Sequence, residues 1–294
     1  NQRALLRLLF DATAATLLKF GRGELGGQVG FTLILHTWDQ RLRAHFHVHG
    51  LIASGALAAD GSQWIAGGRE FLFPVRGLSK MFRAKYLDGL AELLEGEQLD
   101  LPPQLVQLAD PAGRRRWLRR WRKRAWVVYL KPPFAGPRTL IDYLGRYTHR
   151  VASSNHRLLD CQDGQVRYTY RDRQDGDRRK TDVLPADEFL ARFLQHVLPD
   201  RFLRIRHYGL LANCVKRQRL GHCRRLLGAH APPAADEQPH TAAQWMLVLL
   251  DIDVSRCPQC GGPLDSASLP RPGSSRPQGW QTPDRDDFPP WETS

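Results

Sequence analysis

Three histidines alternate with apolar residues in His45-Phe46-His47-Val48-His49, and Gly50-Leu51-Ile52 continues the segment. Side chains of a β-strand point alternately to its two faces, so this pattern predicts a strand with three imidazoles on one face. We expect Phe46 and Val48 to anchor the other face in the core. Neutral imidazoles two residues apart on a rigid strand are able to share one metal ion. The alternative is a cluster of solvated or hydrogen-bonded histidines without a metal.

The residues around this strand predict an α+β fold. Residues 30–38 favour a β-strand, and the polar turn 39–43 makes them the first half of an antiparallel hairpin with residues 45–57. Apolar periodicity and turn residues predict the remaining elements. These are strands near 63–65 and at 125–130, 157–161 and 165–171, and helices at 3–20, 77–94, 139–151, 185–197 and 211–227. We expect a central antiparallel sheet that carries the His-x-His strand and is flanked by helices.

Composition limits the classes of function. The chain has 294 residues, 42% of them hydrophobic, and a formal net charge of +13. This charge predicts a polyanionic partner, and nucleic acid is the leading candidate. The same charge would also suit a ribosomal protein or a membrane-surface protein. No apolar run approaches the roughly 20 residues that a bilayer requires. Five cysteines without a disulfide pattern suit a reducing cytoplasm, and we expect the protein to be associated with the nucleoid there.

Two tyrosines four residues apart, Tyr143 and Tyr147, fall within a predicted helix. This spacing places them on one helix face, in a segment that also contains Arg146 and Arg150. A phenol has a pKa of about 10, so a nucleophilic tyrosine needs activation by a cation such as arginine or a metal ion. The alternative is a pair of core tyrosines on an amphipathic helix.

A dense basic run precedes the tyrosine helix and contains two tryptophans, Trp117 and Trp121. We expect its cations to contact DNA phosphates, with the tryptophans packed inward rather than stacked on bases. Together with Arg146 and Arg150, the predicted DNA-binding residues are Arg114, Arg115, Arg116, Arg119, Arg120, Arg122, Lys123 and Arg124.

The cysteines Cys257 and Cys260, followed by two glycines, have the spacing of a zinc knuckle. They supply half of a tetrahedral site. Completing it requires distant ligands, such as Cys223 or His222, or residues outside the chain. A vestigial knuckle without Zn²⁺ is the alternative.

The chain resembles the two-tyrosine transposases of the HUH endonuclease superfamily in two segments. These are His47-Val48-His49-Gly50-Leu51-Ile52 and Tyr143-Leu144-Gly145-Arg146-Tyr147-Thr148-His149-Arg150-Val151-Ala152-Ser153-Ser154-Asn155-His156-Arg157. Leu35-His36-Thr37-Trp38 and Tyr208-Gly209-Leu210-Leu211-Ala212-Asn213 support the resemblance, which covers roughly residues 30–227.

The resemblance implies metal-dependent nicking of single-stranded DNA and strand transfer through a 5′-phosphotyrosine, in the rolling-circle transposition of bacterial insertion sequences. It implies Mg²⁺ or Mn²⁺ bound by His47 and His49, nucleophiles Tyr143 and Tyr147, and transposon ends as partners. The motif does not fix the third ligand: His45 is a candidate, as are residues of the tyrosine helix or a neighbouring strand. The alternatives are a related relaxase or replication initiator, and a DNA-binding remnant without catalysis.

The composition along the chain and the resemblance together predict its domain organisation. We expect a catalytic domain at residues 1–229 with a helical lead-in at 1–26, a linker with the half zinc knuckle at 230–264, and a disordered tail at 265–294. Family members carry a cysteine-rich zinc-binding segment ahead of the catalytic region, and no cysteine precedes Cys161 here. With Asn1 as the first residue, this predicts that the chain is a fragment of a transposase.

Overall fold

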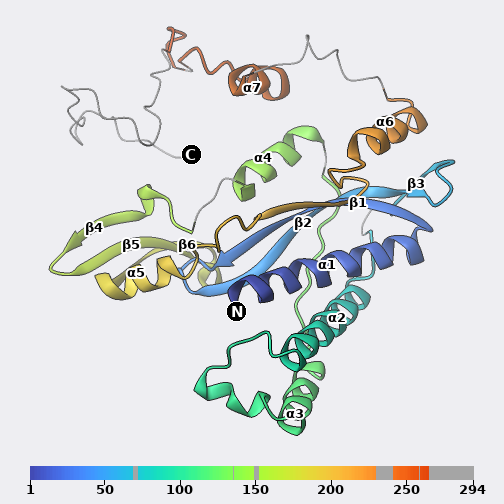
Figure 1. Cartoon of the computed structure of the whole chain (residues 1–294). Helices are drawn as coiled ribbons and strands as arrows, with labels where there is room; N and C mark the ends of the chain where they lie inside the picture. The colour runs from blue at the N-terminus through green and yellow to red at the C-terminus, as the bar shows by residue number, and fades with distance from the viewer. Residues whose placement is uncertain (69–71, 135, 149–151, 230–240, 258, 265–294) are drawn as a thin grey trace. The chain divides into compact units, whose positions relative to one another are not determined.

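Figure 1 shows the computed structural model of the chain, which describes residues 1–68, 72–134, 136–148, 152–229, 241–257 and 259–264. Contacts divide the chain into two units, Asn1–Pro233 and Ala234–Ser294. The first unit is mixed α+β and contains two antiparallel sheets. None of the helices in the described ranges is long and apolar enough to cross a membrane.

The larger sheet has the strand order β3-β2-β1-β7, with every neighbouring pair antiparallel. Its strands are β1 (Gly27–Trp38), β2 (Ala44–Ala58), β3 (Trp64–Ala66) and β7 (Ile205–Gly209). The predicted hairpin and the short third strand are therefore confirmed. Strand β7 was not predicted; it pairs with β1, so that β1 and β2 are the two central strands.

One face of this sheet packs against α1 (Gln2–Glu24), which in turn packs against α2 (Val75–Glu95). Phe31, Leu33 and Leu35 of β1 are fully buried in the same core cluster as Phe10 and Leu17 of α1. Because strand side chains alternate, the odd residues of β1 face α1 and the even residues face the other side. Figure 1 shows α4 (Pro137–Thr148) and α6 (Lys216–Leu226) on that other side.

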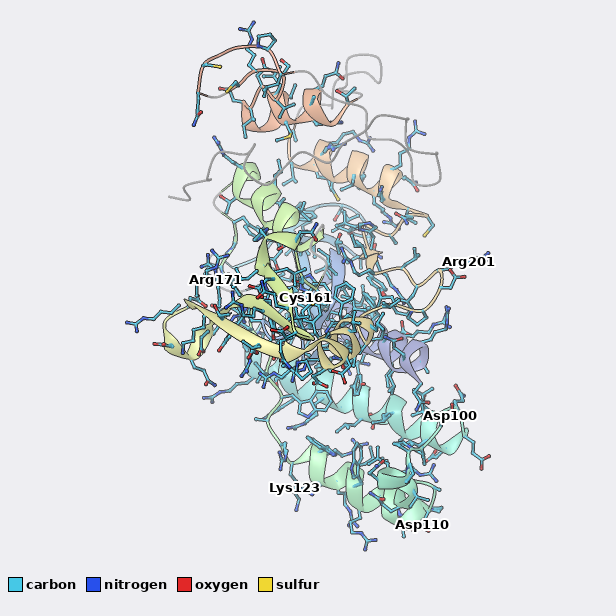
Figure 2. The ribbon with its side chains drawn as sticks, turned by 90° about the vertical axis from the view of Figure 1, so that its left-hand side faces the viewer. Asp100, Asp110, Lys123, Cys161, Arg171 and Arg201 are labelled. Atoms are coloured by element: carbon cyan, nitrogen blue, oxygen red, sulfur yellow. The ribbon has the colours of Figure 1, made fainter. Side chains whose placement is uncertain are left out.

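A 3-10 helix and α3 (Pro111–Arg122) form a small helical layer on α2. The 3-10 helix Pro103–Leu108 leads to α3, which packs against α2 and forms the ion pair Arg122–Asp88. Figure 2 labels Asp110 and Lys123, the residues that flank α3. In both views α3 lies beyond α2, on the side of the sheet opposite to α6.

The predicted strand at residues 125–130 is wrong. This segment has no strand pairing and runs along α2 instead. The ring of Trp126 lies 5.6 Å from that of Phe82 and 5.4 Å from that of Tyr86, and the Ser79 hydroxyl donates to the Trp126 carbonyl. Trp126 therefore packs against α2 and Val128 against the main core, whereas Val127 and Tyr129 are exposed.

The smaller sheet has the order β4-β5-β6, with α5 (Ala186–Leu194) packed against it. Its strands are β4 (Leu158–Gln162), β5 (Gln165–Asp172) and β6 (Arg178–Pro185), and the 3-10 helices Asn155–Arg157 and Arg173–Asp175 adjoin them. Of these strands, β6 was not predicted. Leu42, in the turn between β1 and β2, is fully buried in the core of this sheet beside Tyr168 and Phe189.

The second unit contains α7 (Ala242–Leu250), which begins with a capping box between Thr241 and Gln244. The two cysteines of the predicted knuckle follow it. The predicted disordered tail, residues 265–294, lies outside the described part of the chain.

Candidate metal centre and tyrosine site

Three histidines from the two central strands form one group. In the pairing of β1 with β2, His36 is opposite His47 and Ile34 is opposite His49, so the three imidazoles share a face of the sheet. One ligand atom from each ring lies within 4.8 Å of the others, and the Nε2 atoms of His47 and His49 are 3.1 Å apart. This is the only group of three or more metal-binding side chains in the described ranges.

Hydrogen bonds orient the two histidines of β2. The Nδ1 atom of His47 lies 2.8 Å from the carbonyl oxygen of His45, an arrangement in which Nδ1–H donates and Nε2 keeps its lone pair. Nδ1 of His49 lies 3.2 Å from the Tyr143 hydroxyl. Both rings therefore direct Nε2 toward the centre of the group, as ligands with outer hydrogen bonds do at metal sites.

His36 completes the group from β1. It is buried, its ring stacks on Trp38 at 4.9 Å, and its centroid lies 4.5 Å from that of His49. The sequence pointed only to a neighbouring strand in general terms. The hairpin brings the two strands together, but the turn at residues 39–43 alone would place His36 opposite Phe46; the extra residue of β2 shifts it opposite His47.

His45 lies outside this group, although its ring is 4.7 Å from that of His47. Between the pairs His36/His47 and Trp38/Ala44, β2 has one residue more than β1, which is a β-bulge. Such a bulge turns the strand and redirects its side chains. His45 and Phe46 are both exposed there, so Phe46 does not anchor the core as expected, whereas Val48 does pack against it.

Burial favours the neutral form of His47 and His49. It lowers the pKa of His47, and it lowers that of His49 to about 3, with repulsion from His36, His47, Arg173 and Lys131 adding to the effect. Neutral rings are the form that binds metal. Three imidazole nitrogens suit a divalent transition-metal ion better than Mg²⁺, which prefers oxygen ligands, so of the two expected ions Mn²⁺ fits this group better.

Of the two predicted nucleophiles, Tyr143 lies at the histidine group. It is half-buried, and its ring lies 5.3 Å from that of Phe134 in addition to the contact of its hydroxyl with His49. Tyr147 falls within α4, but its side chain lies outside the described residues, as do the side chain of Arg146 and the whole of Arg150.

The predicted basic run lies on α3 and just after it, on the α2 side of the sheet rather than on the histidine side. Arg114 is buried, Arg122 pairs with Asp88, and Arg124 stacks over Trp121. The remaining cations of the run are also exposed: Arg115, Arg116, Arg119, Arg120 and Lys123. The rings of Trp117 and Trp121 pack on each other, half-buried, as expected for inward packing. Two other cations, Arg173 and Lys131, are the ones whose charge reaches His49. Neither was identified from the sequence.

The cysteine pair of the second unit forms a tight turn. The amide of Gly261 donates to the Cys257 carbonyl at 2.8 Å, and hydrogen bonding around Cys260 lowers the pKa of the Cys257 thiol. No third ligand accompanies the pair within the described residues. Cys223, considered as a distant ligand, is buried with Leu57 and Leu210 in the first unit, and burial raises its pKa.

Comparison with known proteins identifies the family of the chain. Residues 30–219 match the family Y2_Tnp, described as "Putative transposase". The chain is 43% identical over 263 residues to "Putative transposase y4qJ" of Sinorhizobium fredii, covering 88% of this chain and 66% of that protein. It is 29% identical over 263 residues to "Transposase for insertion sequence element IS801" of Pseudomonas savastanoi pv. phaseolicola, covering 88% and 61%. The chain thus spans less than two thirds of the length of these relatives, and no solved structure matches it. By the extent of the family match, the chain belongs to the Y2_Tnp transposase family.

Proposed function

We propose that this chain nicks single-stranded DNA and transfers the cut strand through a 5′-phosphotyrosine, as the chemical step of rolling-circle transposition. The observation that carries the proposal is the position of the Tyr143 hydroxyl, 3.2 Å from Nδ1 of His49, whose Nε2 faces the other two histidines. A nucleophile and a metal centre must meet at one phosphorus, and here both lie at a single imidazole ring.

The residues divide the chemistry between them. The Tyr143 oxygen attacks the phosphorus, the bond from phosphorus to O3′ breaks, and O3′ takes up a proton in place of the one that the phenol loses. A divalent ion held by His36, His47 and His49 would polarise the phosphate as a Lewis acid. His49 also positions the phenol through Nδ1. The cut leaves a free 3′-hydroxyl and keeps the 5′ end on the protein for transfer.

Tyr147 is proposed as the second nucleophile. It follows Tyr143 by four residues in α4, which places both on one face of the helix. Two tyrosines let one hold a DNA end covalently while the other attacks the next strand. Arg146 and Arg150 are proposed to contact the phosphates beside them.

The test is a labelling experiment that also reads the polarity of the cut. Single-stranded oligonucleotides of random sequence, labelled at either end, are incubated with the chain and Mn²⁺, with Mg²⁺, or with a chelator. The proposal expects a metal-dependent covalent adduct that carries the 3′-end label only, because the protein joins the 5′ phosphate of the downstream fragment. An adduct with the 5′-end label contradicts the polarity. A folded, metal-loaded chain without any adduct supports the alternative of a DNA-binding remnant.

A further inference from the structure

Helix α6 is a basic surface that the proposed chemistry does not use. Its sequence, Lys216–Leu226, contains no acidic residue. Its basic residues are Lys216, Arg217, Arg219, His222, Arg224 and Arg225. Four of them are exposed, namely Lys216, Arg217, Arg224 and Arg225, and within the described residues none of these four takes part in an ion pair with a carboxylate.

The other side of α6 holds the helix firmly on the sheet. Cys223 is buried in a cluster with Leu57 of β2 and Leu210, which follows β7. Nε2–H of His222 donates to the carbonyl of Gly61 at 2.6 Å, in the turn between β2 and β3. The exposed arginines are therefore carried on an anchored helix, which lowers the entropy lost when they bind a ligand.

The register of the sheet places α6 on the side that carries the histidines. Thr32 of β1 pairs with His207 of β7, and their side chains are 2.8 Å apart. Thr32 and His36 are both even residues of β1, so His207 shares a face with the metal centre. The charge of Lys216 reaches His207 and helps burial to lower its pKa. Figure 1 shows the same arrangement, with α6 and α4 on the side of the sheet away from α1.

The other basic helix, α3, differs from α6 in its ion pairing and in its position relative to the sheet. One of its arginines is paired with Asp88, and α2 and α1 separate it from the sheet. Its exposed cations are therefore not part of the histidine face, and the predicted phosphate contacts of α3 concern DNA elsewhere on the protein.

We propose that α6 binds the phosphates of the same single strand that enters the metal centre, as a track along β7 and the β2–β3 turn. The inference rests on the proposed function for the identity of the strand. A helix of 11 residues is about 16 Å long, and a stacked strand has one phosphate about every 3.4 Å, so α6 is able to contact several phosphates in succession.

The test compares two matched triple variants in a binding assay without cleavage. Arg217→Gln, Arg224→Gln and Arg225→Gln remove three exposed charges from α6. Arg115→Gln, Arg116→Gln and Arg119→Gln remove three exposed charges from α3. Binding of a fluorescent single strand of about ten nucleotides, within the range of single-strand site sizes, is measured by anisotropy against salt concentration, in chelator.

In the α6 variant, the slope of log K against log salt is expected to become less steep by up to about 2, because each lost phosphate contact removes about 0.7 from the slope. The α3 variant is expected to keep the wild-type slope. Arg→Lys at the three α6 positions is expected to restore the slope, which a merely structural role would not do. An unchanged slope in the α6 variant, or an equal flattening in both variants, overturns the inference.

This assay is independent of the chemistry. A chain that binds through α6 but never forms an adduct would refute the proposed nicking and leave the α6 surface standing. A chain that forms the adduct with unchanged binding in the α6 variant would do the reverse.

Discussion

The hydroxyl of Tyr143 lies 3.2 Å from Nδ1 of His49, a residue 94 positions earlier in the chain. Nε2 of the same ring lies 3.1 Å from Nε2 of His47. One imidazole thus belongs to both the proposed metal centre and the proposed nucleophile. Replacing His49 would disturb both at once, so experiments that separate them must use His36 for the metal and Tyr143 for the phenol.

Tyr143→Phe should abolish or strongly reduce the adduct with a 3′-labelled single strand, because the attacking oxygen is gone. Folding should persist, since the change removes about one hydrogen bond, worth about 0.5–1.5 kcal/mol. Denaturing gels measure the adduct and thermal unfolding checks the fold. Tyr129→Phe, at an exposed tyrosine, is the matched control and should leave adduct formation unchanged. Wild-type adduct levels in Tyr143→Phe would contradict the role of Tyr143.

His36→Ala should weaken Mn²⁺ binding by about 10-fold or more, because it removes one of the three proposed nitrogen ligands. The measurement is the rise in melting temperature on adding Mn²⁺, which reports binding to the folded state and allows for any change in the metal-free chain. His45→Ala, at the exposed neighbour outside the group, should keep the rise. If His45→Ala loses the rise and His36→Ala keeps it, the ligand assignment is wrong.

Stability should fall as the pH is lowered from about 7 to about 5. The pKa of His49 is about 3 in the folded chain, against 6.5 as its ordinary value, and that of His47 is also lowered. Between these values the unfolded chain binds more protons than the folded chain, so the free energy of unfolding rises with pH. Melting temperatures across this range measure the effect. His49→Gln should reduce the slope more than His45→Gln does; equal slopes in the two variants would argue against burial of His49.

Leu42→Ala should destabilise the first unit by about 2–5 kcal/mol, the usual cost of truncating a buried leucine. Leu42 is fully buried in the core of the smaller sheet. Denaturant unfolding measures the change, with Leu203→Ala at an exposed leucine as the control. A cost as small as that of the control would mean that the turn between β1 and β2 does not support the smaller sheet.

Local patterns predicted the parts of the fold in which one face is apolar. The hairpin of β1 and β2, and helices α1, α2 and α4, follow from such patterns. Strand β6 carries Arg178, Arg179 and Lys180 and has little apolar alternation, because only Leu184 is buried along it. Strand β7 is a short edge strand whose position depends on pairing with β1 far earlier in the chain. Neither kind of strand has a strong local signal.

The candidate site was predicted in the same uneven way. His47, His49 and Tyr143 were identified, and the structure brings them together. The replacement of His45 by His36 could not be anticipated from alternation alone, because a bulge in β2 interrupts that alternation at residues 45 and 46. Contacts that depend on one extra residue in a strand appear only once the register is known.

The burial of Leu42 also has a consequence for how the chain is made. The hairpin that bears the histidines is formed by neighbouring residues, but the side chain of Leu42 is buried among later residues of the chain, such as Tyr168 and Phe189. Ribosomes add about 5–20 residues per second, so roughly 7–30 s pass between the synthesis of Leu42 and that of Phe189. During that interval the side chain of Leu42 is exposed to water beside the proposed metal centre. A chaperone or another nascent chain is able to bind it there before the smaller sheet forms.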